Sequence, residues 1–129
     1  MPLTIKTMNQ KGYIKENYLM SFIDFARLSN SRENMFPLTL NNESKEHKAL
    51  KFKIAMELVE KGHKVFVEAI LKGNLGRPDI ISISPKGEGF IWEIVNSESQ
   101  ESINLKLNKY PIDFDVQFIK INEPLEVII

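Results

Sequence analysis

Two short apolar segments joined by a glycine-rich turn constrain the fold of this chain more than any other feature. Residues 78–84 and 89–95 are rich in isoleucine, and residues 85–89, Pro-Lys-Gly-Glu-Gly, lie between them. Proline, glycine and charged residues in such a short connection are typical of a hairpin turn. The sequence therefore predicts two neighbouring strands that run in opposite directions.

The spacing of apolar residues around this hairpin predicts an α/β domain. The elements expected from residue 42 onward are a helix at 42–61, strands at 64–70, 78–84 and 89–95, a helix at 98–110 and a strand at 116–121. Leu50, Ile54 and Leu58, with Phe52, Ala55 and Val59 alongside, form a broad apolar stripe on the first helix. The candidate buried positions of the helix at 98–110 are Ile103, Leu105, Leu107 and Tyr110. This order predicts a layered domain whose central strands are covered by helices on both sides. His63 is predicted to be exposed in a turn, and Trp92 to fill core volume.

The two ends of the chain are expected to extend this core. Residues 15–29 are predicted to form an amphipathic helix, and short strands are expected at 3–8 and 125–129. The buried residues predicted for the N-terminal helix are Tyr18, Leu19, Phe22, Ile23 and Ala26. The apolar helix and the last strand could support a homodimer. The length of 129 residues is sufficient for a single domain.

Composition limits the chemistry and the partners of the chain. Lysine plus arginine and aspartate plus glutamate number 17 each, so the chain is not expected to coat nucleic acid through bulk charge, although a local basic face is allowed. The chain has no cysteine, which excludes disulfides and thiolate-bound zinc. Because we find neither an apolar run of membrane-spanning length nor a signal-peptide pattern, we expect a cytoplasmic protein that does not bind membranes.

Two acidic residues lie on the predicted strand pair. Asp79 stands at the start of one strand and Glu93 within the next, and both have apolar neighbours. Hairpin-linked strands could bring the two carboxylates together, and a metal ion is one of the few partners that compensates two buried carboxylates at once. Oxygen ligands favour Mg²⁺ or Mn²⁺, which would also bind a phosphate ester. The alternative is that Asp79 bonds a turn and Glu93 pairs with a lysine.

The preceding helix carries three polar residues on one side. Glu43, His47 and Lys51 are spaced at i, i+4 and i+8, which places them along one face. A carboxylate, an imidazole and an ammonium group in this arrangement could bind water, the outer shell of a metal and a phosphate. The alternative is a solvated polar face. Neighbouring lysines and Arg77 could form a phosphate-contacting rim, or could simply keep the helix soluble.

These residues form four motifs in chain order. The motifs are Glu43-Ser44-x-x-His47-x-x-x-Lys51, then Glu68, then Arg77-Pro78-Asp79-Ile80, then Ile91-Trp92-Glu93-Ile94-Val95-Asn96-Ser97. Together they resemble the PD-(D/E)XK nuclease superfamily, and within it the CoiA-like competence-associated nucleases. The resemblance covers residues 43–121 and does not extend to residues 1–40. It implies a restriction-endonuclease-like core, in which a central mixed β-sheet in the order αβββαβ is flanked by helices.

The resemblance also implies a role for individual residues. Asp79 and Glu93 would be the ligands of Mg²⁺ or Mn²⁺, and the carbonyl of Ile94 would be an extra ligand. The other implied positions are Glu43 or Glu46 as the helical acid, Glu68 as the first-strand acid, and His47, Lys51 and Ser97 as matches to residues of the family. The implied activity is hydrolysis of phosphodiester bonds, with DNA as the expected partner.

One position departs from the pattern of the family. The second residue after Glu93 is Val95, whereas the superfamily has lysine there and its CoiA-like members have glutamine. Valine neither orients a water molecule nor neutralises a phosphate, so Lys51, Lys106 or Lys109 would have to reach the same space. The sequence thus predicts a metal-dependent nuclease. The alternatives are a catalytically inactive nuclease-fold module that binds nucleic acid or a partner protein, and a purely structural subunit.

Overall fold

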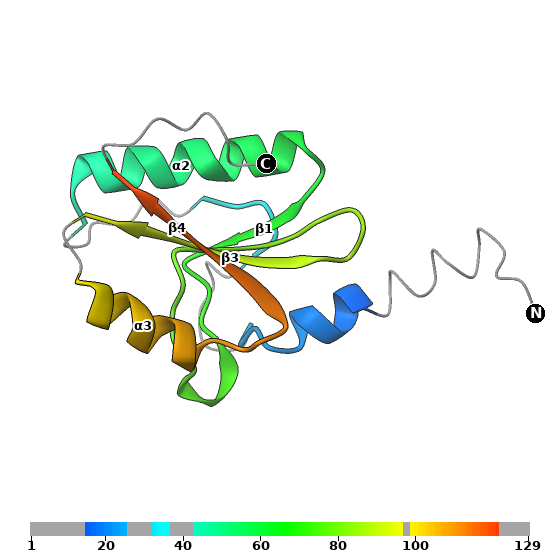
Figure 1. Cartoon of the computed structure of the whole chain (residues 1–129). Coiled ribbons are helices and arrows are strands. Elements are labelled where there is room, and N and C mark those ends of the chain that lie inside the picture. The colour runs from blue at the N-terminus through cyan, green and yellow to red at the C-terminus, as the bar shows by residue number, and fades with distance from the viewer. Residues whose placement is uncertain (1–14, 26–31, 37–42, 97–98, 122–129) are drawn as a thin grey trace, which may run out of the picture.

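A computed structural model describes residues 15–25, 32–36, 43–96 and 99–121 and shows a four-stranded mixed sheet with helices on both of its faces (Figure 1). The elements are a helix at 15–20, α2 (Lys45–Glu60), β1 (Lys64–Val67), the 3-10 turn η1 (Lys72–Asn74), β2 (Ile80–Ile83), β3 (Gly89–Val95), α3 (Gln100–Lys109) and β4 (Phe114–Lys120). This confirms the predicted α/β class and the order of elements from α2 to β4.

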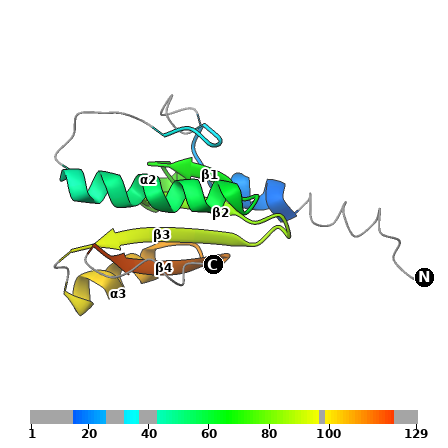
Figure 2. The same ribbon diagram turned by 90° about the horizontal axis from the view of Figure 1, so that it is seen from above.

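The strands lie in the order in which they occur along the chain. β1 pairs with β2 and β2 with β3 in antiparallel fashion, whereas β3 and β4 are parallel. A parallel neighbour requires a crossover connection, and α3 provides it. Helices α2 and α3 lie on opposite sides of the sheet (Figure 1 and Figure 2).

Each face of the sheet has its own apolar core. One core joins α2 to the sheet through Leu50, Ile54, Ala55, Leu58, Val65, Val67, Ile80, Trp92 and Ile94. The other consists of Leu19, Ile23, Phe66, Ala69, Leu71, Ile81, Ile83, Ile91, Tyr110 and Phe114. Side chains alternate between the faces along a strand. Glu93 and Val95 therefore share the face of Ile91, opposite α2.

The predicted hairpin is confirmed. β3 begins and ends at the predicted residues, and its register with β2 pairs Ile83 with Gly89 and Ile80 with Trp92. The turn is closed by the N–H of Ser84, which donates to the carbonyl of Glu88 at 2.8 Å. This register decides which residues meet at the far end of the two strands.

The helix predicted for residues 15–29 is wrong for residues 21–25, and residues 26–29 lie outside the described residues. Residues 21–25 are not helical, and Ile23 instead forms an isolated bridge with Leu71. The N–H of Asp24 donates to the carbonyl of Ile70 at 2.7 Å, and the N–H of Lys72 donates to that of Phe22 at 2.8 Å. Pairing with a distant segment thus replaces the helical hydrogen bonds. Tyr18, which lies within the helix and was predicted to be buried, is exposed.

Several predictions about burial are also wrong. Leu105 and Leu107, expected to be buried, are exposed, and so is Phe52 on α2. His63, expected to be exposed, is buried because its ring Nδ1 contacts the hydroxyl of Ser82 at 3.2 Å.

The first turn of α2 differs from the prediction as well. The helix begins at Lys45, and the hydroxyl of Ser44 accepts the N–H of His47 at 3.1 Å as the N-cap. The strands predicted at 3–8 and 125–129, together with Ala26, Asn42 and Ser97, lie outside the described residues. Among the helices that the structure describes, none is long and apolar enough to cross a membrane.

Candidate metal centre

The strand register brings three acidic residues together where β1 ends and β2 begins. Val67 pairs with Ile80, and Ile80 pairs with Trp92. Glu68 follows Val67 in the chain, Asp79 precedes Ile80, and Glu93 follows Trp92. Glu68, Asp79 and Glu93 therefore lie at neighbouring places where the strands approach the start of α2.

Asp79 is held at the centre of this group. Its Oδ2 accepts the backbone N–H of Ile94 at 2.9 Å. Its Oδ1 lies 3.3 Å from Nε2 of His47 and 3.9 Å from Nζ of Lys51. Burial alone would raise the pKa of Asp79, but the hydrogen bonds from His47 and Ile94 outweigh it and lower the pKa. Asp79 is thus an anchored carboxylate with one oxygen directed at α2.

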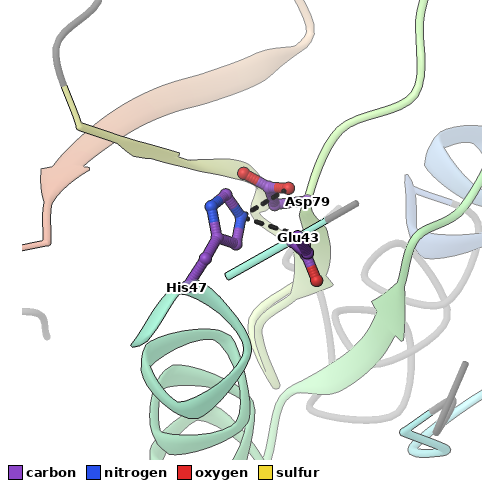
Figure 3. Close-up of side chains that lie close together, drawn as sticks. All are labelled: Glu43, His47 and Asp79. Atoms are coloured by element: carbon purple, nitrogen blue, oxygen red, sulfur yellow. Dashed lines mark hydrogen bonds and ion pairs between the residues drawn. The ribbon is translucent and has the colours of Figure 1, made fainter. Parts of the chain in front are cut away.

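Glu43, His47 and Asp79 offer a set of ligand atoms for a cation (Figure 3). Nε2 of His47 lies 3.1 Å from Oε2 of Glu43, and the three ligand atoms lie within 4.8 Å of one another. Two carboxylate oxygens and an imidazole nitrogen fit a divalent ion such as Mn²⁺, whereas Mg²⁺ prefers oxygen ligands alone. The hydrogen bond to Asp79 raises the pKa of His47, although burial opposes it. A proton on His47 therefore holds the acids together where a divalent ion could bind instead.

Lys51 is buried beneath the acids, with a side chain only 2% exposed. Its Nζ lies 2.5 Å from Oε2 of Glu43 and 3.2 Å from Oε1 of Glu68. Glu68 adopts a positive φ of 57°, which is uncommon for a residue with a side chain and occurs preferentially at functional sites. In this conformation its N–H donates to the carbonyl of Asp79 at 2.9 Å. The contacts of Lys51 and the backbone hydrogen bond between Glu68 and Asp79 together hold the acids in place.

Glu93 faces the same cleft from the α3 side. The hydroxyl of Tyr110, the residue after α3, donates to its Oε1, and Nζ of Lys106 lies 3.9 Å from its Oε2. Burial, and next the charge of Asp79, raise the pKa of Glu93 to about 7. The Tyr110 ring packs on Gly76, where a Cβ would lie 2.8 Å from ring Cε1. Only a glycine allows this close approach.

Both predicted ligands, Asp79 and Glu93, line one open cleft of about 310 Å³. The other lining residues are His47, Gly76, Arg77, Ile94, Lys106, Lys109 and Tyr110. A second cleft of about 350 Å³, near the hairpin turn, is lined mostly by apolar and aromatic side chains. Of these two clefts, the first combines two acids with three cations, so it is the candidate site.

The structure also decides between residues that the sequence left open. Glu46 is exposed on α2, whereas Glu43, the residue before the N-cap Ser44, contacts His47 and Lys51, so Glu43 is the acid of the site although it lies outside the helix. Val95 is buried and makes no polar contribution. Tyr110 was predicted only as a core residue, and its contact with Glu93 was missed. A tyrosine at a helix end signals such a contact, because a buried hydroxyl needs a hydrogen-bond partner.

Comparisons of the chain with protein-family models, with curated proteins and with solved structures found no match. The resemblance to PD-(D/E)XK nucleases therefore stays a prediction made from the motifs. The geometry of the cleft has to support any proposal about function.

Proposed function

We propose that this chain is a metal-dependent nuclease with a restriction-endonuclease-like core that hydrolyses phosphodiester bonds in DNA. The observation that carries the proposal is the convergence of Asp79 and Glu93 on one cleft, with Glu43 and His47 at its α2 wall. Glu43, His47 and Asp79 each offer a ligand atom, and these atoms lie within 4.8 Å of one another. The order of strands and helices agrees with the motif pattern.

Asp79 would be the central ligand because its Oδ1 lies 3.3 Å from Nε2 of His47 and its carboxylate lines the same cleft as Glu93. Glu43 and His47 would complete the α2 side, and Glu93 the α3 side, with the Ile94 carbonyl as a further ligand. A divalent ion, Mg²⁺ or Mn²⁺, would supply Lewis-acid activation of the phosphodiester and of water. Hydrolysis joins a water oxygen to phosphorus and breaks the ester bond, and the departing sugar oxygen takes up a proton.

The superfamily has a lysine at the position of Val95, and a lysine from one of the helices would take over its role here. Lys51 is buried against Glu43 and Glu68, so its role would be to hold those carboxylates in place. Lys106 lines the cleft beside Glu93 and is 34% exposed. Lys106 is therefore better placed than Lys51 to contact a phosphate.

The test is cleavage of labelled DNA in the presence of Mn²⁺ or Mg²⁺. The wild-type chain should cleave, and Asp79→Asn and Glu93→Gln should abolish cleavage because each removes a proposed ligand. Glu60→Gln, an exposed position at the end of α2, makes the same chemical change away from the cleft and should cleave normally. Equal cleavage by the wild type and both cleft variants would refute the proposal.

A second candidate function is binding of nucleic acid without cleavage. The observation in its favour is Val95, which is only 4% exposed and cannot neutralise a phosphate at the position where the family has a polar side chain. Metal and DNA binding without cleavage of duplex, single-stranded or branched DNA would favour this second function.

A further inference from the structure

Helix α3 turns lysines toward the cleft and leucines away from it. Lys106 and Lys109 line the cleft, whereas Leu105 is 66% exposed and Leu107 43%. None of the ten residues of α3 is buried. A surface helix normally does the opposite, with its leucines on the protein and its lysines in water. Packing against the sheet therefore does not explain the orientation of α3.

A third cation reaches the cleft from another part of the chain. Arg77 belongs to the segment before β2 and also lines the cleft. Its Nη2 lies 3.8 Å from Oε2 of Glu68, and its side chain is 52% exposed. Arg77, Lys106 and Lys109 come from two separate segments, and we call these three residues the basic rim.

The charges of the cleft are divided between its two walls. The α2 wall carries Glu43 and His47, with Lys51 beneath them. The α3 wall carries Lys106 and Lys109, the two lysines of the basic rim. The acidic and basic groups around the cleft are four carboxyl groups, Glu43, Glu68, Asp79 and Glu93, and four cations, Lys51, Arg77, Lys106 and Lys109. Three of these four cations belong to the basic rim, so positive charge is concentrated on that wall without a metal ion. Such a cleft attracts an anion, and the rim is the wall along which it would lie.

We propose that the basic rim is a binding subsite for the phosphate backbone of a DNA strand, holding the phosphates next to the one that is cleaved. This inference rests on the proposed function for the position of the strand, but not on hydrolysis itself. Arg77 can grip a phosphate with two parallel N–H groups, and the lysines act as point charges. Contacts of this kind position a strand without reading its sequence.

The experiment measures binding of a fluorescent single-stranded oligonucleotide by anisotropy over a range of salt concentrations. EDTA is present throughout, so that no metal-dependent cleavage takes place. Each phosphate contact contributes roughly 0.7 to the slope of log affinity against log salt for a single strand. Lys106→Gln with Lys109→Gln should thus lower the slope by roughly 1.4, and Arg77→Gln by about half as much. Affinity should fall by a similar factor for oligonucleotides of different sequence.

The matched control is Lys53→Gln with Lys61→Gln, which removes the same charge at two exposed positions of α2 and its cap. This control should keep the wild-type slope. Equal slopes in the rim and control variants, or no oligonucleotide binding by the wild type, would overturn the inference. Competition by inorganic phosphate at the same concentration of phosphate groups would show a site for free phosphate and would also overturn it.

The two proposals can fail separately. A wild-type chain that binds DNA through the rim but never cleaves it would refute the nuclease and leave the rim intact. A chain that cleaves DNA, but whose rim variants keep the wild-type salt slope, would refute the rim alone.

Discussion

Glu93→Gln should stabilise the metal-free protein at neutral and alkaline pH. Glu93 is buried beside another carboxylate, and these two conditions raise its pKa from the ordinary value of 4.5 to about 7. Between these values the folded chain holds a proton that the unfolded chain has released. Stability therefore falls as pH rises through this window, and above pH 7 the folded protein carries an unfavourable buried charge.

The size of this effect follows from the two pKa values. At roughly 1.4 kcal/mol for each pH unit, the window from 4.5 to about 7 corresponds to about 3 kcal/mol. Glutamine is neutral at every pH, has nearly the same shape, and can accept the hydroxyl of Tyr110. The variant should thus be more stable than the wild type by up to about 3 kcal/mol near pH 8.5, and the difference should vanish near pH 4.

The assay is urea unfolding of both chains in EDTA at several pH values. Subtracting one free energy of unfolding from the other cancels the titration of groups that the two chains share. With a urea dependence of about 2 kcal/mol per M, the midpoint should differ by roughly 1.5 M at high pH. A difference that does not change with pH, or one that favours the wild type at high pH, would refute the burial argument. Added Mn²⁺ should reverse the order, because only the wild type keeps the ligand.

Three further predictions follow from the contacts of the cleft. Lys51→Met should lower the free energy of unfolding by roughly 3 kcal/mol, because it leaves buried carboxylates without their cation; the exposed Lys53→Met should change it by less than about 0.5 kcal/mol in the same urea assay. Gly76→Ala should destabilise the chain by roughly 1–3 kcal/mol, because φ is 125° there and the new Cβ would meet Tyr110; an unchanged melting temperature would contradict this. Mn²⁺ affinity, measured by calorimetry, should rise with pH from about 6 to 8, because His47, whose pKa is raised, and Glu93, whose pKa is about 7, must each lose a proton before binding metal. An affinity that is flat over this range would remove both residues from the ligands.

Local patterns were sufficient to predict the hairpin and the order of elements. The isoleucine-rich segments and the glycine-rich turn define β3 to the residue, because turn chemistry and strand alternation are both short-range properties. The same register places Asp79 beside Glu93. The acids of the candidate site could therefore be predicted from sequence.

Interactions between distant segments could not be predicted in this way. The bridge from Ile23 to Leu71 ends a helix that its own sequence would have continued. The burial of Lys51 depends on Glu68, 17 residues further along the chain. The contact of Tyr110 with Glu93 depends on how α3 crosses the sheet. Each of these features is decided by tertiary packing, which overrides local propensity.

An anomalous difference map from crystals soaked in Mn²⁺ tests the account most directly. We predict a peak in inner-sphere contact with Oδ1 of Asp79, shared with His47 and Glu43 or with Glu93, and no such peak in Asp79→Asn. A map in which Mn²⁺ binds elsewhere, or in which Oδ1 of Asp79 keeps its contact with Nε2 of His47 and binds no ion at saturating Mn²⁺, would contradict the metal centre.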